Sequence, residues 1–397
     1  MTTRIALNGN NQNWLIGIGE GDCLEVKVNV DWQKVDDFIA HNKGKHLFIA
    51  LSYDAGFELL PVNKKSKKRT FPLIRIWTAE AVYSSTGNGV VQLSGEKSQH
   101  HEKSALSFLT NQTNEIAPLT WKATTPKADY LAHLNALKNE IQFGNIYEIN
   151  YCQEFFVANC SLQSMQPLYT TLNEHTLAPF SACIETENWM LACASPERFI
   201  QKIGNRLISQ PIKGTAARNT DPVADEALKV ALQASQKERS ENVMIVDLVR
   251  NDLSKIATKG SVEVTELFGV YSFPTVHQLI STVACDVEPN TSFAAIIAAL
   301  FPMGSMTGAP KISAMNLSEE HEDFARELYS GSIGVIYPSG DFDLNVVIRS
   351  LFYDVTEKRL SVGVGGAITI NSDPESEYLE CKTKVGKILS LFGSCEW

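Results

Sequence analysis

The residue of this sequence with the clearest chemical potential is Lys213, which lies in the segment Pro211-Ile212-Lys213-Gly214-Thr215. A solvated lysine has a pKa of about 10.4 and is a poor nucleophile near neutral pH. A lysine held on a short strand beside a glycine can instead be desolvated, lose its proton and attack an electrophile. The alternative is a strand end with a solvated lysine, and only the rest of the chain can decide between the two.

Carboxylates occur in three places where packing alone does not explain them. Glu241 lies on the apolar stripe of a predicted helix, where an acid is costly unless it is paired or bound to a metal. Glu377, Glu380 and Lys384 lie on one side of the last predicted helix, although surface ion pairing also explains that triplet. Glu197 lies at the edge of a predicted strand, where an acid could face a cleft.

These acids suggest a metal and a class of substrate. Glutamates without histidine or cysteine nearby favour a hard, oxygen-preferring cation, so the sequence predicts Mg²⁺ rather than zinc. Magnesium relies on anionic groups of its substrate, which is therefore predicted to be a carboxylate or phosphate, with Lys384 and Arg349 available to pair with it.

The glycine-rich segments 304–311 and 363–367 lack the pattern of nucleotide-binding loops and instead offer backbone N–H groups to a small anion. His277 stands among apolar residues, and on its own that is typical of a core histidine.

The composition restricts partners and location. The chain has 397 residues, of which 44% are hydrophobic and 20% charged, as in an ordinary soluble globular protein. The net charge of −10 argues against a nucleic-acid partner, and the basic run 64–69 is predicted to be a solvated loop. No stretch approaches the ~20 apolar residues of a membrane span. The eight cysteines form no CxxC pair, which favours reduced, buried thiols in a cytoplasmic protein.

The N-terminal part differs in pattern from the rest. Residues 1–120 contain short β-like runs and are predicted to pack on a catalytic part that covers residues 127–392. The polar stretch 94–104, followed by residues 111–114, is the predicted flexible connection.

The catalytic part mixes strands and helices. The predicted elements are a helix over 127–143, strands over 149–157 and 206–212, one long helix from 221 to about 255, an antiparallel meander of three strands over 332–337, 342–353 and 359–370, and a last helix over 373–392. Because strands and helices do not alternate as regular βαβ units, the predicted fold class is α+β with large antiparallel β-sheets.

Eight blocks of this part together resemble the chorismate-utilising enzymes. The blocks are residues 195–199, 211–215, 237–242 running into 247–253, 277–279, 301–302 with 308–311, 345–350, 365–367 and 377–380. They follow one another in the order and at the spacing of the family. The resemblance implies a chorismate-binding enzyme whose antiparallel sheets form a two-layer, sandwich-like core with helices packed outside.

The resemblance also implies roles for single residues. Glu241 and Glu380 match the magnesium ligands, supported by Glu377, and Glu197 matches the general acid that helps the ring hydroxyl leave. Hydroxide is a poor leaving group, so protonation and a metal-anchored carboxylate would both lower the barrier. The implied substrate-binding residues are Gly214, Thr215, Tyr329, Arg349, Gly365, Gly366 and Lys384, and His277 is implied to be catalytic.

Members of the family differ in the nucleophile and in the carbon that it attacks. The lysine at position 213 resembles the members that aminate ring carbon 4, where Lys213 would attack carbon 2 and ammonia would then displace it from carbon 4. Water-adding members have a lysine base where this chain has Glu148, and amine-adding members usually have glutamine there.

The implied reaction needs a source of ammonia. No cysteine stands in a Gly-x-Cys-x-Gly elbow, so ammonia is expected from a separate glutamine amidotransferase. Two alternatives stay open from the sequence. One is amination at carbon 2, which yields anthranilate, and the other is a non-catalytic docking subunit of an amidotransferase complex.

Overall fold

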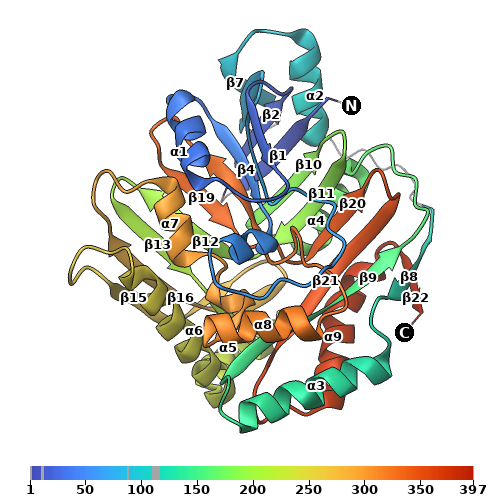
Figure 1. Ribbon diagram of the computed structural model, residues 1–397. Helices are drawn as coiled ribbons and strands as arrows, with labels where there is room; N and C mark the ends of the chain where they lie inside the picture. Colours follow the sequence, from blue (N-terminus) through green and yellow to red (C-terminus); the bar gives the residue numbers. More distant parts are fainter. Residues whose placement is uncertain (1, 10–12, 87–88, 110–116, 397) are drawn as a thin grey trace.

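Two large β-sheets form the centre of the computed structural model, which describes residues 2–9, 13–86, 89–109 and 117–396 (Figure 1). Within these residues the first sheet has the strand order β22-β8-β9-β21-β20-β11-β10-β1-β2-β6-β7, with β17 paired to β9. The second has the order β14-β16-β13-β12-β19-β18-β4-β5-β3, with β15 paired to β16. All of these pairings are antiparallel except β22 with β8, so the predicted α+β class with large antiparallel sheets is confirmed.

The strands of the first sheet are β1 (Arg4–Gly9), β2 (Asn13–Ile18), β6 (Ala81–Thr86), β7 (Gly89–Gly95), β8 (Leu119–Ala123), β9 (Glu148–Val157), β10 (Phe180–Glu185), β11 (Trp189–Ser195), β17 (Gly308–Ala309), β20 (Ser350–Asp354), β21 (Arg359–Ile368) and β22 (Gly393–Glu396). Those of the second are β3 (Cys23–Val26), β4 (Leu47–Leu51), β5 (Ile74–Thr78), β12 (Arg198–Ile203), β13 (Arg206–Gln210), β14 (Ile212–Ala217), β15 (Glu263–Ser272), β16 (Val276–Asp286), β18 (Ser332–Ile336) and β19 (Phe342–Asn345).

The helices are α1 (Trp32–His41), α2 (Gln99–Leu109), α3 (Lys127–Gln142), α4 (Gln166–Thr176), α5 (Pro222–Ala234), α6 (Gln236–Ser254), α7 (Phe293–Leu300), α8 (Lys311–His321) and α9 (Pro374–Leu389), with short 3-10 turns η1 (Tyr53–Glu58) and η2 (Gly304–Met306). None of the described helices is both long and apolar enough to cross a membrane.

Four apolar clusters hold these layers together, one of which packs α2 on β1, β2 and β6. The largest contains residues of both sheets together with α6 and α7. A second packs α4 and α9 on the first sheet, and a third joins α3, α8 and α9 to the end of β9. Tyr130, Leu134 and Leu137 of α3 are buried in the third cluster, which confirms the amphipathic helix predicted there.

The predicted meander is wrong, because its middle strand is two strands in different sheets. β19 pairs in the second sheet, whereas β20 pairs in the first. Between them the chain leaves the ladder, with Arg349 at a left-handed φ of 53°. The segment 342–353 is rich in β-forming apolar residues on both sides of this crossing, so its composition did not reveal the crossing.

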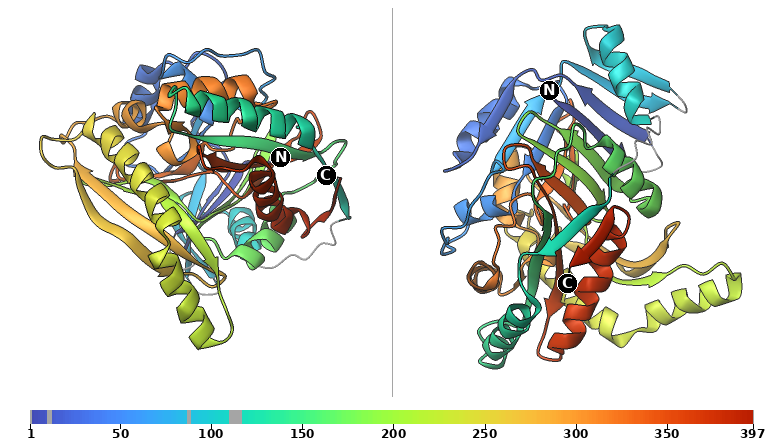
Figure 2. Two further views of the ribbon diagram at one scale, coloured as in Figure 1. Left: turned by 90° about the horizontal axis from the view of Figure 1, so that it is seen from below. Right: turned by 90° about the vertical axis from the view of Figure 1, so that its right-hand side faces the viewer.

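Two other elements are interrupted. The predicted long helix is divided at Ser235, whose backbone is extended and whose hydroxyl accepts a hydrogen bond from the N–H of Glu238. This serine therefore ends α5 and caps α6. The predicted strand 206–212 is divided at Pro211, which has no N–H to donate to the ladder. The first of the two helices, α5, projects from the body of the molecule (Figure 2).

Two predicted loops are more ordered than expected. Most of the stretch 94–104 belongs to α2 rather than to a flexible connection, while residues 111–114 lie outside the described residues. The basic run 64–69 is a loop, but Lys67 and Arg69 are not free in solvent: both pair with Glu319, and Arg69 also pairs with buried Asp54. The predicted division at residue 120 stays a prediction, and residues 4–95 contribute strands to both sheets.

Candidate active site

Two neighbouring strand crossings place an acid and a cation together. β11 leads from the first sheet into β12 of the second through Glu197, and β19 returns to β20 through Arg349. The crossings are tied to each other, since Val346 N–H donates to the Glu197 carbonyl at 3.0 Å and Ala194 N–H to the Arg349 carbonyl at 3.2 Å. Because the strands on either side are paired in register, both residues are fixed by the two sheets at once.

The Glu197 carboxyl is buried and titrates near neutrality. Its side chain is only 6% exposed, and burial raises its pKa to about 7. A hydrogen bond with Ser305, the charges of Lys213 and Arg349 and the backbone at Ile212 favour the ionised form and limit the rise. A carboxyl with such a pKa can hold a proton at neutral pH and release it, which is what a general acid requires.

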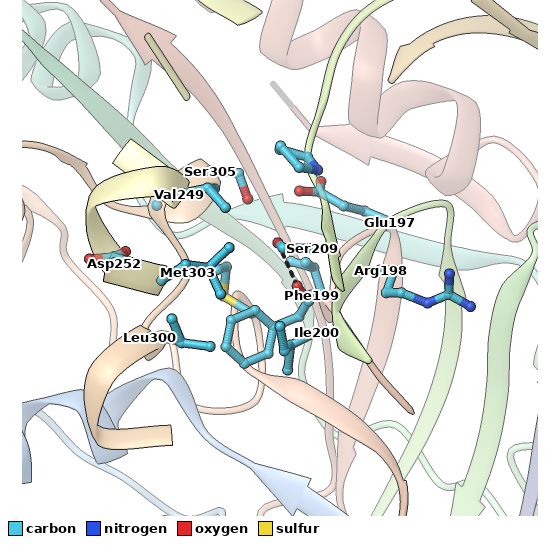
Figure 3. A pocket seen from close by; sticks show the side chains of 14 residues that line it. Glu197, Arg198, Phe199, Ile200, Ser209, Val249, Asp252, Leu300, Met303 and Ser305 are labelled. Carbon is cyan, nitrogen blue, oxygen red and sulfur yellow. Dashed lines mark hydrogen bonds between the residues drawn. The ribbon is translucent and has the colours of Figure 1, made fainter. Parts of the chain in front are cut away.

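A small cavity lies behind Glu197 (Figure 3). Its volume of about 20 Å³ admits roughly one water molecule. Glu197, Ser209, Asp252 and Ser305 contribute polar groups to its lining. The cavity is too small for a substituted ring, so it is not the substrate site. It lies among the residues that pack around Glu197.

Lys213 lies at an irregular point of β14. The pairing of β14 with β16 shifts between Ile212 and Thr215, and Gly214 adopts φ 91°, which a residue with a side chain rarely adopts. A Cβ at Gly214 would also approach Glu238 Oε2 to 2.9 Å. The Lys213 side chain is 13% exposed, and its Nζ lies 3.4 Å from Glu148 Oε1. Lys213 is therefore a partly buried lysine paired with an acid, and its reactivity stays a prediction.

Glu148 is the first residue of β9 and is held firmly. Buried Arg326 donates to the carbonyls of Asn150 at 2.7 Å and Met306 at 2.6 Å, which ties β9 to the turn that carries Ser305. The charge of Arg326 is balanced by Glu322 at 2.6 Å. This buried ion pair thus holds the start of β9, which carries Glu148, against the turn that carries Ser305.

The three predicted metal ligands lie on two helices, Glu241 on α6 and Glu377 and Glu380 on α9. Lys237 acts on the pKa values of Glu241, Glu377 and Glu380. Burial raises the pKa of Glu241, with Lys213 opposing it, and burial likewise raises that of Glu377. Burial also opposes ionisation of Glu380, but Lys384, Lys237 and Lys213 outweigh it and lower its pKa.

This donor set fits a hard cation in chemistry. It consists of carboxylate oxygens, and partly buried carboxylates favour a compensating positive charge. Among the described residues no three acidic, histidine or cysteine side chains converge closely enough to hold an ion. The acids present would therefore bind magnesium with few protein ligands, together with water or substrate oxygens.

The remaining predicted binding residues are divided between the two faces of β21. Gly366 faces α9, since a Cβ there would lie 3.5 Å from Glu377 Oε2 and 3.9 Å from Lys384 Nζ. Lys384 pairs with Glu380 at 2.7 Å and donates to the Gly365 carbonyl at 3.3 Å.

Tyr329 lies on the opposite face of β21. Its ring packs where a Cβ at Gly363 would be, and a Cβ at Gly365 would meet Cys152 Sγ on that same face. The side chain of Tyr329 is 4% exposed, and burial raises its pKa well above the usual range. The structure thus shows Tyr329 as a support beneath the strand rather than as a group beside Lys384.

His277 does not join the other predicted site residues. Its Nε2 lies 3.0 Å from Asp225 of α5 and its Nδ1 2.8 Å from the Ser272 hydroxyl, so both ring nitrogens are engaged. Thr215 lies next to it in the ladder and is exposed. The contacts of His277 fix α5 to the second sheet and give no sign of a catalytic position.

Sequence reasoning missed several residues of this site. Lys237 lies in the block 237–242 and Ser305 in the glycine-rich segment 304–311. Their contacts depend on how α6 and η2 approach the strands. Arg326 left no signal of its own, since an arginine near Glu322 at helical spacing is usual on protein surfaces.

Comparisons with known proteins identify the family of this chain. The sequence pattern of the family described as "chorismate binding enzyme" matches residues 6–390. The aminodeoxychorismate synthase component 1 of Salmonella typhimurium strain LT2 is 36% identical over 297 residues, which are 74% of this chain and 64% of that protein. The chain thus matches less than two thirds of the length of this curated relative.

Solved structures share the fold. Anthranilate synthase component I from Streptococcus pneumoniae TIGR4 superposes with a TM-score of 0.76 at 21% identity, covering 97% of this chain and 90% of that one. The menaquinone-specific isochorismate synthase of Escherichia coli gives a TM-score of 0.75 at 16% identity, covering 98% and 88%. The paired crossings at Glu197 and Arg349, the buried Lys213 and the acids of α6 and α9 thus occur in a chain that belongs to the family of chorismate-binding enzymes.

Proposed function

We propose that this chain acts as aminodeoxychorismate synthase component I, which joins chorismate and ammonia to give 4-amino-4-deoxychorismate, the precursor of 4-aminobenzoate and folate. The observation that carries the proposal is the position of Lys213. It is mostly buried, hydrogen-bonds Glu148, and its charge is felt by Glu197, Glu241 and Glu380. The names of relatives at 36% and 37% identity support the same assignment.

The chemistry assigns a role to each charged group. Lys213 attacks ring carbon 2 and the hydroxyl leaves from carbon 4, with its proton supplied by Glu197. Arg349 and Lys384 pair with the anionic groups of chorismate. Glu241, Glu380 and Glu377 would hold Mg²⁺, which when bound supplies positive charge to the ring carboxylate.

Ammonia is assigned to a partner protein. The relatives are named as component 1, which implies a second component, and the family blocks contain no nucleophilic cysteine elbow. We propose a glutamine amidotransferase as this partner. A docking subunit without activity would not need a buried acid with a pKa near 7 beside a buried lysine. The eight free cysteines, six of them buried, support a reducing, cytoplasmic location.

The assignment is tested by the product. Purified protein with chorismate, Mg²⁺ and ammonium is expected to form 4-amino-4-deoxychorismate, separated by chromatography and identified by mass and ring-proton NMR. If anthranilate is the only product, the chain is instead assigned to the members of the family that aminate carbon 2. Formation of no product, although chorismate binds, would favour the docking subunit.

Removal of magnesium is expected to lower activity strongly. Treatment with a chelator, followed by dialysis, should remove detectable turnover, and added Mg²⁺ should restore it. Glu241→Gln should weaken the response to Mg²⁺ by about tenfold or more, because one anionic oxygen donor is lost. Isothermal titration of the protein with Mg²⁺ gives a readout that does not depend on turnover. If the Mg²⁺ affinity of Glu241→Gln is unchanged, Glu241 is not a ligand of the metal.

A further inference from the structure

Glu148 and Lys213 form an ion pair in which the acid is buried and the lysine is partly buried. Glu148 is 3% exposed and its Oε1 lies 3.4 Å from Lys213 Nζ. Within the described part of the chain, the Lys213 amine donates its hydrogen bond to this carboxylate. The positive charge of Lys213 favours the ionised forms of three other acids, Glu197, Glu241 and Glu380. The negative charge of Glu148 acts in the opposite direction on Glu241.

We propose that Glu148 is the positioning residue that accepts the proton of Lys213 and thereby makes it a nucleophile, an inference that rests on the proposed function. A lysine ammonium has no lone pair and cannot attack carbon. Its proton must move to a base within hydrogen-bond reach, and Glu148 Oε1 has that position. When a substrate excludes water, transfer of the proton converts two buried charges into two neutral groups, which a low-dielectric site favours.

The proton and electron balance closes over one turnover. The proton moves from Lys213 Nζ to Glu148, a bond forms from Nζ to ring carbon 2, the ring double bonds shift, and the bond from carbon 4 to oxygen breaks. Glu197 gives its proton to the departing hydroxyl, which leaves as water. Ammonia then bonds to carbon 4, the double bonds shift back, and the bond from carbon 2 to Nζ breaks. Glu148 returns its proton to Lys213, and the new ammonium group loses a proton to Glu197.

The site around β9 suits this role. Glu148 cannot turn away easily, because the hydrogen bonds of Arg326 hold the next residues of β9 and β17 pairs with Glu148 itself. The pair is therefore kept together by backbone contacts that do not depend on its own charges. A glutamine would keep the size and the hydrogen bond but could not take the proton.

The decisive experiment compares Glu148→Gln with Glu148→Asp and with Asp247→Asn, an exposed acid of α6 that serves as the matched control. Each protein is mixed with chorismate and Mg²⁺ without ammonia. The rate of the covalent adduct, a mass increase of chorismate minus one water, is followed by intact-protein mass spectrometry from pH 6 to pH 9. Melting temperature and chorismate affinity are measured in parallel.

Glu148→Gln is expected to form the adduct about 10²-fold more slowly near pH 7, with unchanged chorismate affinity. Its rate should rise with pH, because solvent must now take the proton. Glu148→Asp should retain part of the rate, and Asp247→Asn should behave as the parent protein. Adduct formation by Glu148→Gln at the parent rate with the parent pH profile would overturn the proposal.

The outcome separates this inference from the proposed function. If the parent protein forms no 4-amino-4-deoxychorismate when ammonium is added, the proposed function fails whatever the variants do. If it does form this product while Glu148→Gln matches it in rate and pH profile, only the role of Glu148 fails. Should Glu148→Gln not fold, the Glu148→Asp profile decides: loss of the adduct with intact chorismate binding contradicts the proposal, because a carboxylate is still present.

Discussion

Replacement of Lys213 by alanine is expected to abolish formation of 4-amino-4-deoxychorismate while chorismate still binds. Without the amine, ammonia would have to displace the hydroxyl directly at carbon 4, and the two-step route through carbon 2 is lost. Removal of a covalent nucleophile lowers turnover by several orders of magnitude, on the order of 10⁴-fold or more. Product formation should be followed by chromatography and chorismate binding by calorimetry.

Lys213→Arg is the matched control for this prediction. Arginine keeps the positive charge felt by Glu197, Glu241 and Glu380 but does not deprotonate near neutral pH. If Lys213 acts only through its charge, the arginine variant should retain most activity. If it acts as a nucleophile, both variants should be inactive and neither should gain the mass of an adduct. Full activity of the alanine variant would rule out the covalent route.

Glu197→Gln is expected to lower turnover by about 10³-fold and to remove the basic limb of the pH profile. In the parent protein burial raises the pKa of Glu197 to about 7. A general acid must carry its proton, so activity should be highest below that pH and fall as pH rises through about 7. The glutamine cannot donate an acidic proton, and its residual rate should not follow this titration.

The measurement is kcat against pH for both proteins between pH 5.5 and 9. Glutamine is neutral, as the protonated acid is, and it preserves the hydrogen-bonding capacity toward Ser305, so the melting temperature should change little. A parent profile that stays flat through pH 7, or a Glu197→Gln profile that still falls there, would assign the proton to another group.

Much of the site could be predicted from sequence because its residues stand in local patterns. The turn at Gly214, the acids on one side of α9 and the capped start of that helix at Asp373 are visible within a few positions of one another. Lys213 stands beside a left-handed glycine at a strand irregularity, so its place on β14 follows from local backbone geometry, while its role as a nucleophile stays a prediction.

What could not be predicted depends on contacts between distant segments. The partnership of Lys213 with Glu148 joins residues 65 positions apart, and that of Glu197 with Ser305 depends on which sheet each strand enters. The sheet change at Arg349 was hidden because the residues on both sides of it are apolar and suit a buried strand in either sheet. The contacts of His277 were equally hidden, since its block does not reveal that its ring meets Asp225 of α5, and its catalytic role stays a prediction.

The two crossings at Glu197 and Arg349 also bear on how such an enzyme can change during evolution. The chain passes between the two sheets at both places, so a one-residue shift of a paired strand there would turn its side chains to the other face. Glu148 and Lys213 stand instead at the first residue of β9 and at the irregular part of β14, where a side chain can change without shifting a ladder. A substitution at Glu148 or Lys213 can therefore change the charges beside Glu197 without changing the order of the strands.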